Sequence, residues 1–116
     1  MTENLLEIVC EENLAILKID GEIIFDNSNS FKEESKKRIS EKNCDHLIID
    51  LSKVPYIDSS GIGFILSLFK FMRTQGGKLV IANANQKIKK VFEITKMTQV
   101  FQMYDNIEEA IENLEK

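Results

Sequence analysis

The sequence predicts an α/β domain with a mixed, largely parallel β-sheet, an N-terminal β-hairpin and about four helices. Two apolar segments near the N-terminus alternate with polar residues and flank a short polar turn, which is typical of a hairpin. Two later apolar runs are short and rich in β-branched residues, the pattern of strands that are covered on both faces. Helical segments of roughly ten to sixteen residues follow the later strands, and such crossover connections favour parallel pairing.

The first part of the chain contains the predicted hairpin and one helix. Residues 5–10 and 14–19 are predicted strands joined by "EEN", and residues 23–25 are expected to continue the sheet. Residues 28–43, "SNSFKEESKKRISEKN", are predicted to form a solvated helix. Its weakly apolar inner stripe consists of Phe31, Ser35 and Ile39.

The central part of the chain alternates between strand and helix. "HLIIDL", residues 46–51, is a predicted buried strand. A helix is expected from Ser59 to about Gln75, and the two glycines that follow can end it. "KLVIA", residues 78–82, is the next predicted buried strand.

The C-terminal part repeats this alternation. The segment "NQKIKKVFEIT" is a predicted helix with Asn85 as its cap, and "VFQMY", residues 100–104, is a predicted last strand. "NIEEAIENLEK" is expected to form a terminal helix that starts on Asn106.

Composition and charge exclude several functions. A chain of 116 residues suits one domain, and 43% hydrophobic with 29% charged residues is typical of a globular protein. The net charge of −4 argues against direct nucleic-acid binding, which needs clustered Lys and Arg. The N-terminus has no basic region ahead of an apolar one, and the longest apolar run, residues 61–69, falls far short of the roughly 20 residues that span a bilayer. We therefore expect a cytoplasmic protein without membrane insertion.

The segment "SKVPYIDSSG" is the longest loop that leaves the carboxyl end of a predicted strand, where α/β sheets usually carry binding sites. A helix that begins near Asp58 leaves its first N–H groups unpaired, and Asp or Ser side chains can cap them. Capping alone does not account for two serines and two glycines, because Gly61 and Gly63 each cost the helix up to about 1 kcal/mol relative to alanine. We expect these glycines to let another backbone come close.

The helix after this loop is apolar over most of its surface, in two neighbouring stripes. The first stripe consists of Ile62, Ile65, Leu66, Phe69 and Met72, and the second of Phe64, Leu68 and Phe71. The second stripe either packs under an adjacent helix or is partly an exposed docking surface. Packing is the favoured alternative, and Phe64, the member nearest the loop, is the best candidate for exposure if part of the stripe is exposed.

Enzymatic and metal chemistry have little support in the sequence. The only histidine, His46, is expected roughly 15 Å or more from Ser59, which excludes a serine-hydrolase triad. No metal-ligand spacing and no complete phosphate-binding motif occurs, so no cofactor, no metal and no catalytic residue is expected.

Cys10 and Cys44 lie far apart in the chain. Two reduced thiols are expected, with a structural disulfide as the less favoured alternative.

The segment "YIDSSGIGFILSLFK" resembles the signature of STAS domains in bacterial anti-sigma factor antagonists, in which Asp-Ser-Ser/Thr-Gly opens the second helix. "LKIDGEI" resembles the family's strand and Gly-Glu-Leu/Ile turn, and "GGKLVIAN" its next strand. "VFEITKMTQVFQMYDNIEEAI" resembles its terminal helix, strand and helix, so the likeness covers residues 14–114. The resemblance implies that residues 1–116 form a single STAS domain.

The resemblance also implies partner switching. The unmodified antagonist binds an anti-sigma factor that is also a serine kinase; phosphorylation releases it, and a serine phosphatase resets it. By motif position the phosphoacceptor is Ser59, with Ser60 as the fallback. The expected partner-binding residues are Asp58, Ser59, Ser60, Gly61, Ile62, Gly63 and Phe64.

Two positions depart from the family's pattern. Ile24 stands where the family commonly has Asp after the Gly-Glu-Leu/Ile turn, and Lys96 stands where glycine is frequent. The missing carboxylate leaves open an alternative function, a STAS interaction module in a signalling assembly that is not phosphorylated. A small-ligand sensor or carrier that uses the same loop is a third hypothesis, supported only by the general position of sites in α/β sheets.

Overall fold

The computed structural model describes residues 5–114, in which five strands form one mixed sheet in the order β1-β2-β3-β4-β5. Strands β1 (Leu5–Glu11) and β2 (Leu14–Asp20) form the predicted antiparallel hairpin. The other three strands, β3 (His46–Asp50), β4 (Leu79–Ala82) and β5 (Met103–Tyr104), continue the sheet in parallel. The predicted fold class is confirmed.

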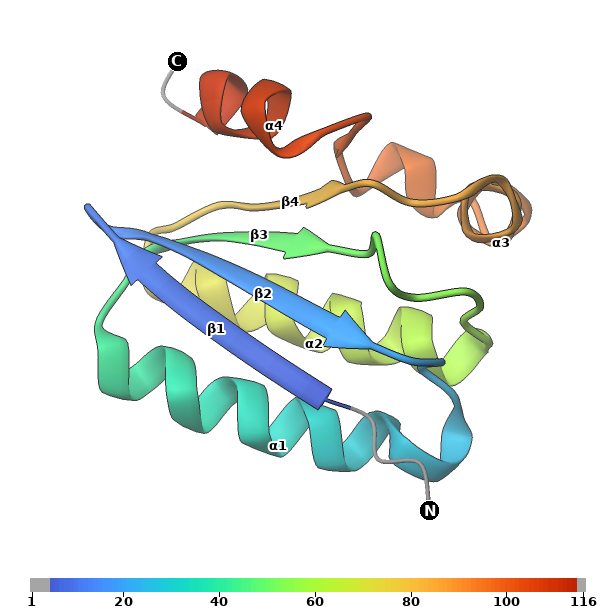
Figure 1. Cartoon of the computed structure of the whole chain (residues 1–116), viewed down its shortest axis with the longest axis horizontal. Helices are drawn as coiled ribbons and strands as arrows, with labels where there is room; N and C mark the ends of the chain where they lie inside the picture. The colour runs from blue at the N-terminus through green and yellow to red at the C-terminus, as the bar shows by residue number, and fades with distance from the viewer. Residues whose placement is uncertain (1–4, 115–116) are drawn as a thin grey trace.

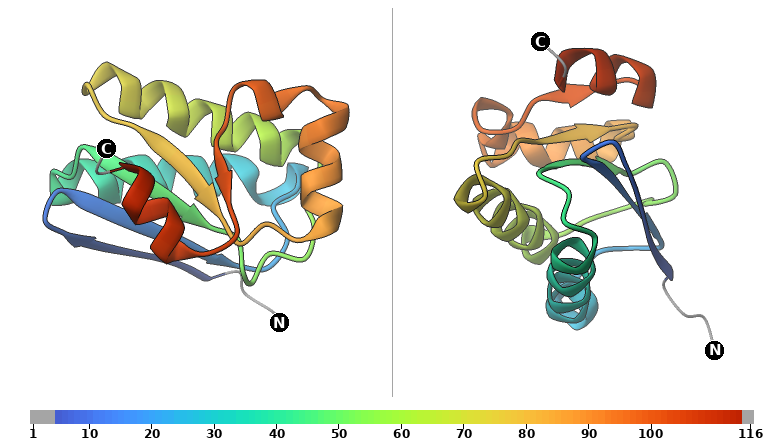
Figure 2. Two further views of the ribbon diagram at one scale, coloured as in Figure 1. Left: turned by 90° about the horizontal axis from the view of Figure 1, so that it is seen from above. Right: turned by 90° about the vertical axis from the view of Figure 1, so that its left-hand side faces the viewer.

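Helices cover the two faces of the sheet unequally (Figures 1 and 2). Helices α1 (Phe25–Lys42) and α2 (Ser59–Thr74) lie side by side on one face. Helix α4 (Ile107–Leu114) lies on the other face and buries Ala110 and Leu114 against Ile48 and Val80. Helix α3 (Gln86–Ile94) and a short 3₁₀ turn, η1 (Met97–Gln99), connect β4 to β5.

The predicted helix starts are confirmed where a side chain caps the helix. Asn85 Oδ1 accepts a hydrogen bond from the N–H of Ile88 at 2.9 Å, and Asn106 Oδ1 accepts from the N–H of Glu109 at 2.8 Å. Each cap satisfies an N–H that the helix itself leaves unpaired. Helix α2 ends before Gly76, which has a left-handed φ of 77°.

Two predicted strand segments are confirmed only in part, because each is shorter than expected. Only Ile23 of residues 23–25 pairs, as an isolated parallel bridge to Ile57, and α1 already begins at Phe25. Asn27 drives this early start because its side chain accepts a hydrogen bond from the N–H of Ile24 at 2.9 Å. Of residues 100–104 only the last two are strand, because the preceding 3₁₀ turn takes Val100 into its hydrogen bonding.

Both apolar stripes of α2 pack against the core, with Leu66, Phe69 and Phe71 only partly buried. The first faces the sheet, and the second packs under α1, where the rings of Phe31 and Phe64 lie 6.2 Å apart between centroids. Phe64 is only 2% exposed, so the packing alternative is confirmed and Phe64 as the candidate for exposure is wrong. The inner stripe of α1 is confirmed, since Phe31, Ser35 and Ile39 are all buried.

The two cysteines are neighbours in space, contrary to the expectation of two separate reduced thiols. Cys10 in β1 and Cys44 after α1 have Cα atoms 6.5 Å apart, and their sulfur atoms are paired as a disulfide. The hairpin turn and the end of α1 meet at the same end of the sheet, which brings together residues that are 34 positions apart.

Candidate partner-binding site

Asp58 organises the serine loop. It is the N-cap of α2, and its Oδ1 atom accepts hydrogen bonds from the N–H groups of Ser60 at 2.8 Å and Gly61 at 3.2 Å. Its Oδ2 atom accepts from the N–H of Phe25 at 3.1 Å. One carboxylate therefore caps α2 and also ties the start of α1 to it.

A backbone contact holds the loop against the end of β2. The N–H of Ile23 donates to the carbonyl of Tyr56, and the N–H of Asp58 donates to the carbonyl of Ile23, each at 3.2 Å. A Cβ atom on Gly61 would lie 2.8 Å from that Ile23 carbonyl oxygen. The expected close approach is therefore present at Gly61, whereas a Cβ on Gly63 would meet nothing within 4 Å.

The predicted partner-binding residues divide into a surface group and a buried group. Ser59 and Gly63 are exposed, and Asp58 and Ser60 are half-buried. Gly61, Ile62 and Phe64 are buried by the sheet and by α1, so their side of α2 builds the core. Four of the seven predicted residues remain available at the surface: Asp58, Ser59, Ser60 and Gly63.

Phe25 was missed by the sequence prediction. It is the first residue of α1, its backbone is bonded to Asp58, and its side chain is 78% exposed. It lines a shallow groove of about 350 Å³ between α1 and α2 together with Ser28, Asn29, Lys32, Ser60, Gly63, Phe64 and Ser67. Phe25 was missed because "IIF" was assigned to a strand. The polar run "DNSNS" that follows could have indicated a helix start at this point.

We use the name docking surface for Phe25, Asp58, Ser59, Ser60 and Gly63. It combines a hydroxyl group at the start of a helix with an exposed aromatic ring. The residues between them are small. Such a surface suits contact with another protein, because an exposed aromatic side chain becomes buried there.

No catalytic arrangement surrounds Ser59 in the part of the chain that the structure describes. His46 lies at the opposite end of β3, where its Nδ1 atom accepts a hydrogen bond from the N–H of Lys78 at 3.1 Å. Residues 5–114 contain no group of three or more His, Cys, Asp or Glu side chains that could hold a metal ion.

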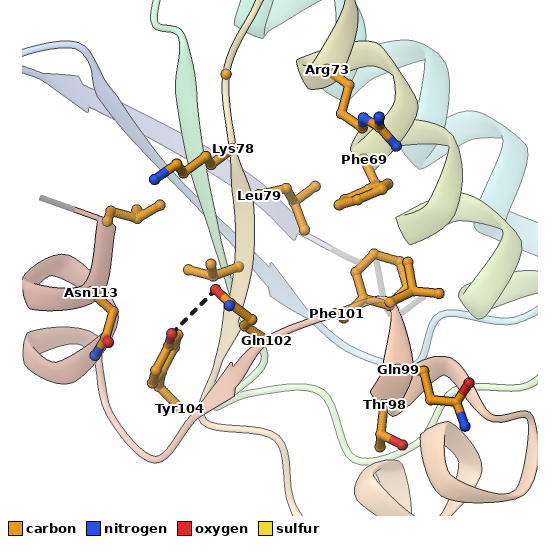
Figure 3. Close-up of a pocket in the computed structure, with 14 residues that line it drawn as sticks. Phe69, Arg73, Lys78, Leu79, Thr98, Gln99, Phe101, Gln102, Tyr104 and Asn113 are labelled. Atoms are coloured by element: carbon orange, nitrogen blue, oxygen red, sulfur yellow. Dashed lines mark hydrogen bonds between the residues drawn. The ribbon is translucent and has the colours of Figure 1, made fainter. Parts of the chain in front are cut away.

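A larger hollow of about 530 Å³ lies at the β4–β5 edge of the sheet (Figure 3). Phe69, Leu79 and Phe101 form its apolar wall, and the Tyr104 hydroxyl donates a hydrogen bond to Gln102 Oε1 at 3.3 Å. None of its lining residues belongs to the docking surface. The hollow therefore gives no support to a small-ligand site that uses the serine loop.

The chain belongs to the STAS domain family, whose model matches residues 6–110. It is 24% identical to the anti-sigma F factor antagonist of Paenibacillus polymyxa over 95% of this chain and 94% of that protein. It is 30% identical to the anti-sigma-B factor antagonist of Bacillus subtilis over 82% of this chain and 85% of that protein.

The same class appears among solved structures. A Thermotoga maritima protein assigned as an anti-sigma factor antagonist superposes with a TM-score of 0.89 at 25% identity, covering 96% of this chain and 95% of that one. Within residues 5–114, no helix is long and apolar enough to cross a membrane.

Proposed function

We propose that this protein is an anti-sigma factor antagonist that works by partner switching, and that Ser59 is the residue whose phosphorylation controls it. The unphosphorylated protein binds an anti-sigma factor that is also a serine kinase. Phosphorylation of Ser59 releases the complex, and a serine phosphatase restores the binding form. The protein acts as a regulator and not as an enzyme. The relatives named above support the general role.

One observation carries the choice of Ser59. It is exposed at the first position of α2, whereas the neighbouring Ser60 is half-buried and its N–H is bonded to Asp58. A kinase needs to reach the hydroxyl group and the backbone on both sides of it, and Ser59 meets that requirement better than Ser60.

The hydrogen bonds of Asp58 determine what a phosphate on Ser59 encounters. Phosphoserine brings about −1.5 to −2 charges. The nearby N–H groups of Phe25, Ser60 and Gly61 already donate to the Asp58 carboxylate, so they are not free to neutralise a second anion. The added charge therefore stays on the docking surface, next to an existing negative charge.

This charge is tolerated in water but opposes a partner that covers Phe25. Binding would remove water from the phosphate and the carboxylate at the same time as it buries the aromatic ring. A loss of about 4 kcal/mol in binding free energy corresponds to a roughly thousandfold weaker complex. Phosphorylation can thus act as a switch without a change of fold.

The test combines phosphorylation-site mapping with affinity capture. We expect protein purified from its native cells to carry phosphate on Ser59 in at least one growth state, and Ser59→Ala to carry none. Ser60→Ala is the matched control and should be phosphorylated like the parent. Ser59→Asp should lose a kinase partner that the parent retains. Equal phosphorylation of Ser59→Ala and the parent would contradict the assignment.

A second candidate function is a STAS interaction module that is never phosphorylated. The observation that favours it is Ile24, which stands where the family commonly has a carboxylate; it precedes Phe25, whose N–H donates to Asp58 in the serine loop. Absence of phosphate on Ser59 in all growth states, with a partner retained equally by the parent and Ser59→Asp, would support this module.

A further inference from the structure

The two cysteines form a cluster that the proposed function does not use. Cys10 lies near the end of β1, and Cys44 lies between α1 and β3. Their Cα atoms are 6.5 Å apart, within the range that a disulfide spans without backbone movement. The pair lies at the end of the sheet opposite the start of α2 (Figure 1).

Polar contacts hold the two cysteines together independently of the sulfur–sulfur bond. Asn13, in the turn between β1 and β2, accepts a hydrogen bond at Oδ1 from the N–H of Asp45 at 2.9 Å. Its Nδ2 donates to Asp45 Oδ2 at 3.2 Å, and its carbonyl accepts from the N–H of His46 at 3.2 Å. The turn after Cys10 is thus fixed to the segment that carries Cys44, so the two thiols remain neighbours when they are reduced.

The two cysteine residues differ in access to solvent. Cys44 is 1% exposed and belongs to the core, whereas Cys10 is half-buried on the edge strand. Cys10 Sγ also lies 3.8 Å from the carbonyl oxygen of Lys42, at the end of α1. A dissolved disulfide or thiol can therefore reach Cys10 but not Cys44.

We propose that Cys10 and Cys44 form a reversible redox modification site, in which Cys10 exchanges with low-molecular-weight disulfides and Cys44 is the buried resolving thiol. The Cys10 thiolate attacks one sulfur of glutathione disulfide, which forms a Cys10–glutathione bond and releases one glutathione thiolate. The Cys44 thiolate then attacks Cys10 Sγ and releases the second glutathione. Two protein thiols are oxidised and one glutathione disulfide is reduced, and the thiol protons pass to the two glutathione molecules released.

The reverse reaction begins at the same atom. Excess glutathione attacks Cys10 Sγ, releases the Cys44 thiolate, and a second glutathione then frees Cys10. The disulfide joins β1, an edge strand, to the segment that follows α1, whereas the docking surface contains the start of α1. The redox state of the two cysteines is therefore a modification of the protein that is separate from the phosphorylation of Ser59.

The experiment places the reduced full-length protein in glutathione redox buffers, quenches with acid and measures the intact mass. We expect the parent to lose the mass of two hydrogens in oxidising buffer and to regain it in excess glutathione. Cys44→Ala, which lacks the resolving thiol, should accumulate a glutathione adduct on Cys10. Cys10→Ser, while folded by circular dichroism, should acquire no adduct. Ser59→Ala is the control and should behave like the parent.

Two results would overturn the proposal. One is a folded parent protein that keeps both thiols in fully oxidising buffer. The other is a folded Cys10→Ser protein that is modified at Cys44 as fast as Cys44→Ala is modified at Cys10. If a variant does not fold, peptide mapping of the parent after brief exposure replaces it: the first adduct must lie on Cys10, and a first adduct on Cys44 refutes the mechanism. None of these outcomes depends on a kinase partner.

Discussion

Replacing Gly61 with alanine tests how the serine loop is positioned. The added methyl group would lie 2.8 Å from the Ile23 carbonyl oxygen and 2.8 Å from Ile57 Cβ. Both of these residues are fully buried, so neither can move aside without disturbing the core. Overpacking of this kind costs about 1–3 kcal/mol. Alanine in place of glycine returns up to about 1 kcal/mol of helix propensity, so we expect a net loss of up to about 2 kcal/mol in the free energy of unfolding.

Gly63→Ala is the matched control, because it changes the same residue type in the same helix. A Cβ at Gly63 would have no neighbour within 4 Å, so this variant should gain up to about 1 kcal/mol. The propensity gain is common to both variants, and the difference between them isolates the steric cost. With a urea slope of about 1–3 kcal/mol per M, the two unfolding midpoints should differ by about 1 M.

Urea unfolding followed by circular dichroism measures both midpoints. Equal midpoints for the two variants would refute the close packing of α2 on the Ile23 backbone. A lower midpoint for Gly63→Ala than for Gly61→Ala would contradict the assignment of the exposed and the buried side of α2.

Three further predictions concern the docking surface and the cysteine pair. Asp58→Ala removes the cap of α2 and the acceptor for the Phe25 N–H, so the free energy of unfolding should fall by about 1–2 kcal/mol; an unchanged urea midpoint would contradict this role. Phe25→Ser should change stability by less than about 0.5 kcal/mol, because the side chain is 78% exposed, yet weaken partner capture at least about tenfold. Val9→Ser, at an exposed position in β1, is its control and should leave capture unchanged. Reduction of the disulfide between Cys10 and Cys44, 34 positions apart, should lower the free energy of unfolding by roughly 3–4 kcal/mol, measured as the difference between urea midpoints with and without dithiothreitol.

The elements with strong patterns were predictable from the sequence. Strands β3 and β4 are short apolar runs that the structure buries on both faces, and the helix caps Asp58, Asn85 and Asn106 have the expected side-chain chemistry. The caps depend on contacts within three residues along the chain, and an unbroken apolar run is itself a local pattern, so local sequence is sufficient to indicate both.

The incorrect predictions share a physical cause. Residues 23–25 have strand composition, but only Ile23 finds a partner strand, and Asn27 turns the rest into a helix start. Residues 100–104 likewise contain strand formers, but only Met103 and Tyr104 pair in register with β4. Strand formation requires a neighbour with free backbone groups, and the position of that neighbour is set by the whole fold.

The sequence by itself determined the α/β class, the order of the elements and the chemistry of the loop, an aspartate followed by two serines at the start of a helix. Only the tertiary structure decided that Phe64 is buried, that Phe25 is exposed beside the serines, and that Cys10 meets Cys44. The spacing of residues along the chain predicts which side chains share one face of a helix or strand. Burial and contact depend on what packs against that face, and in this protein α1 is the element that covers Phe64, presents Phe25 and leads the chain back toward Cys10.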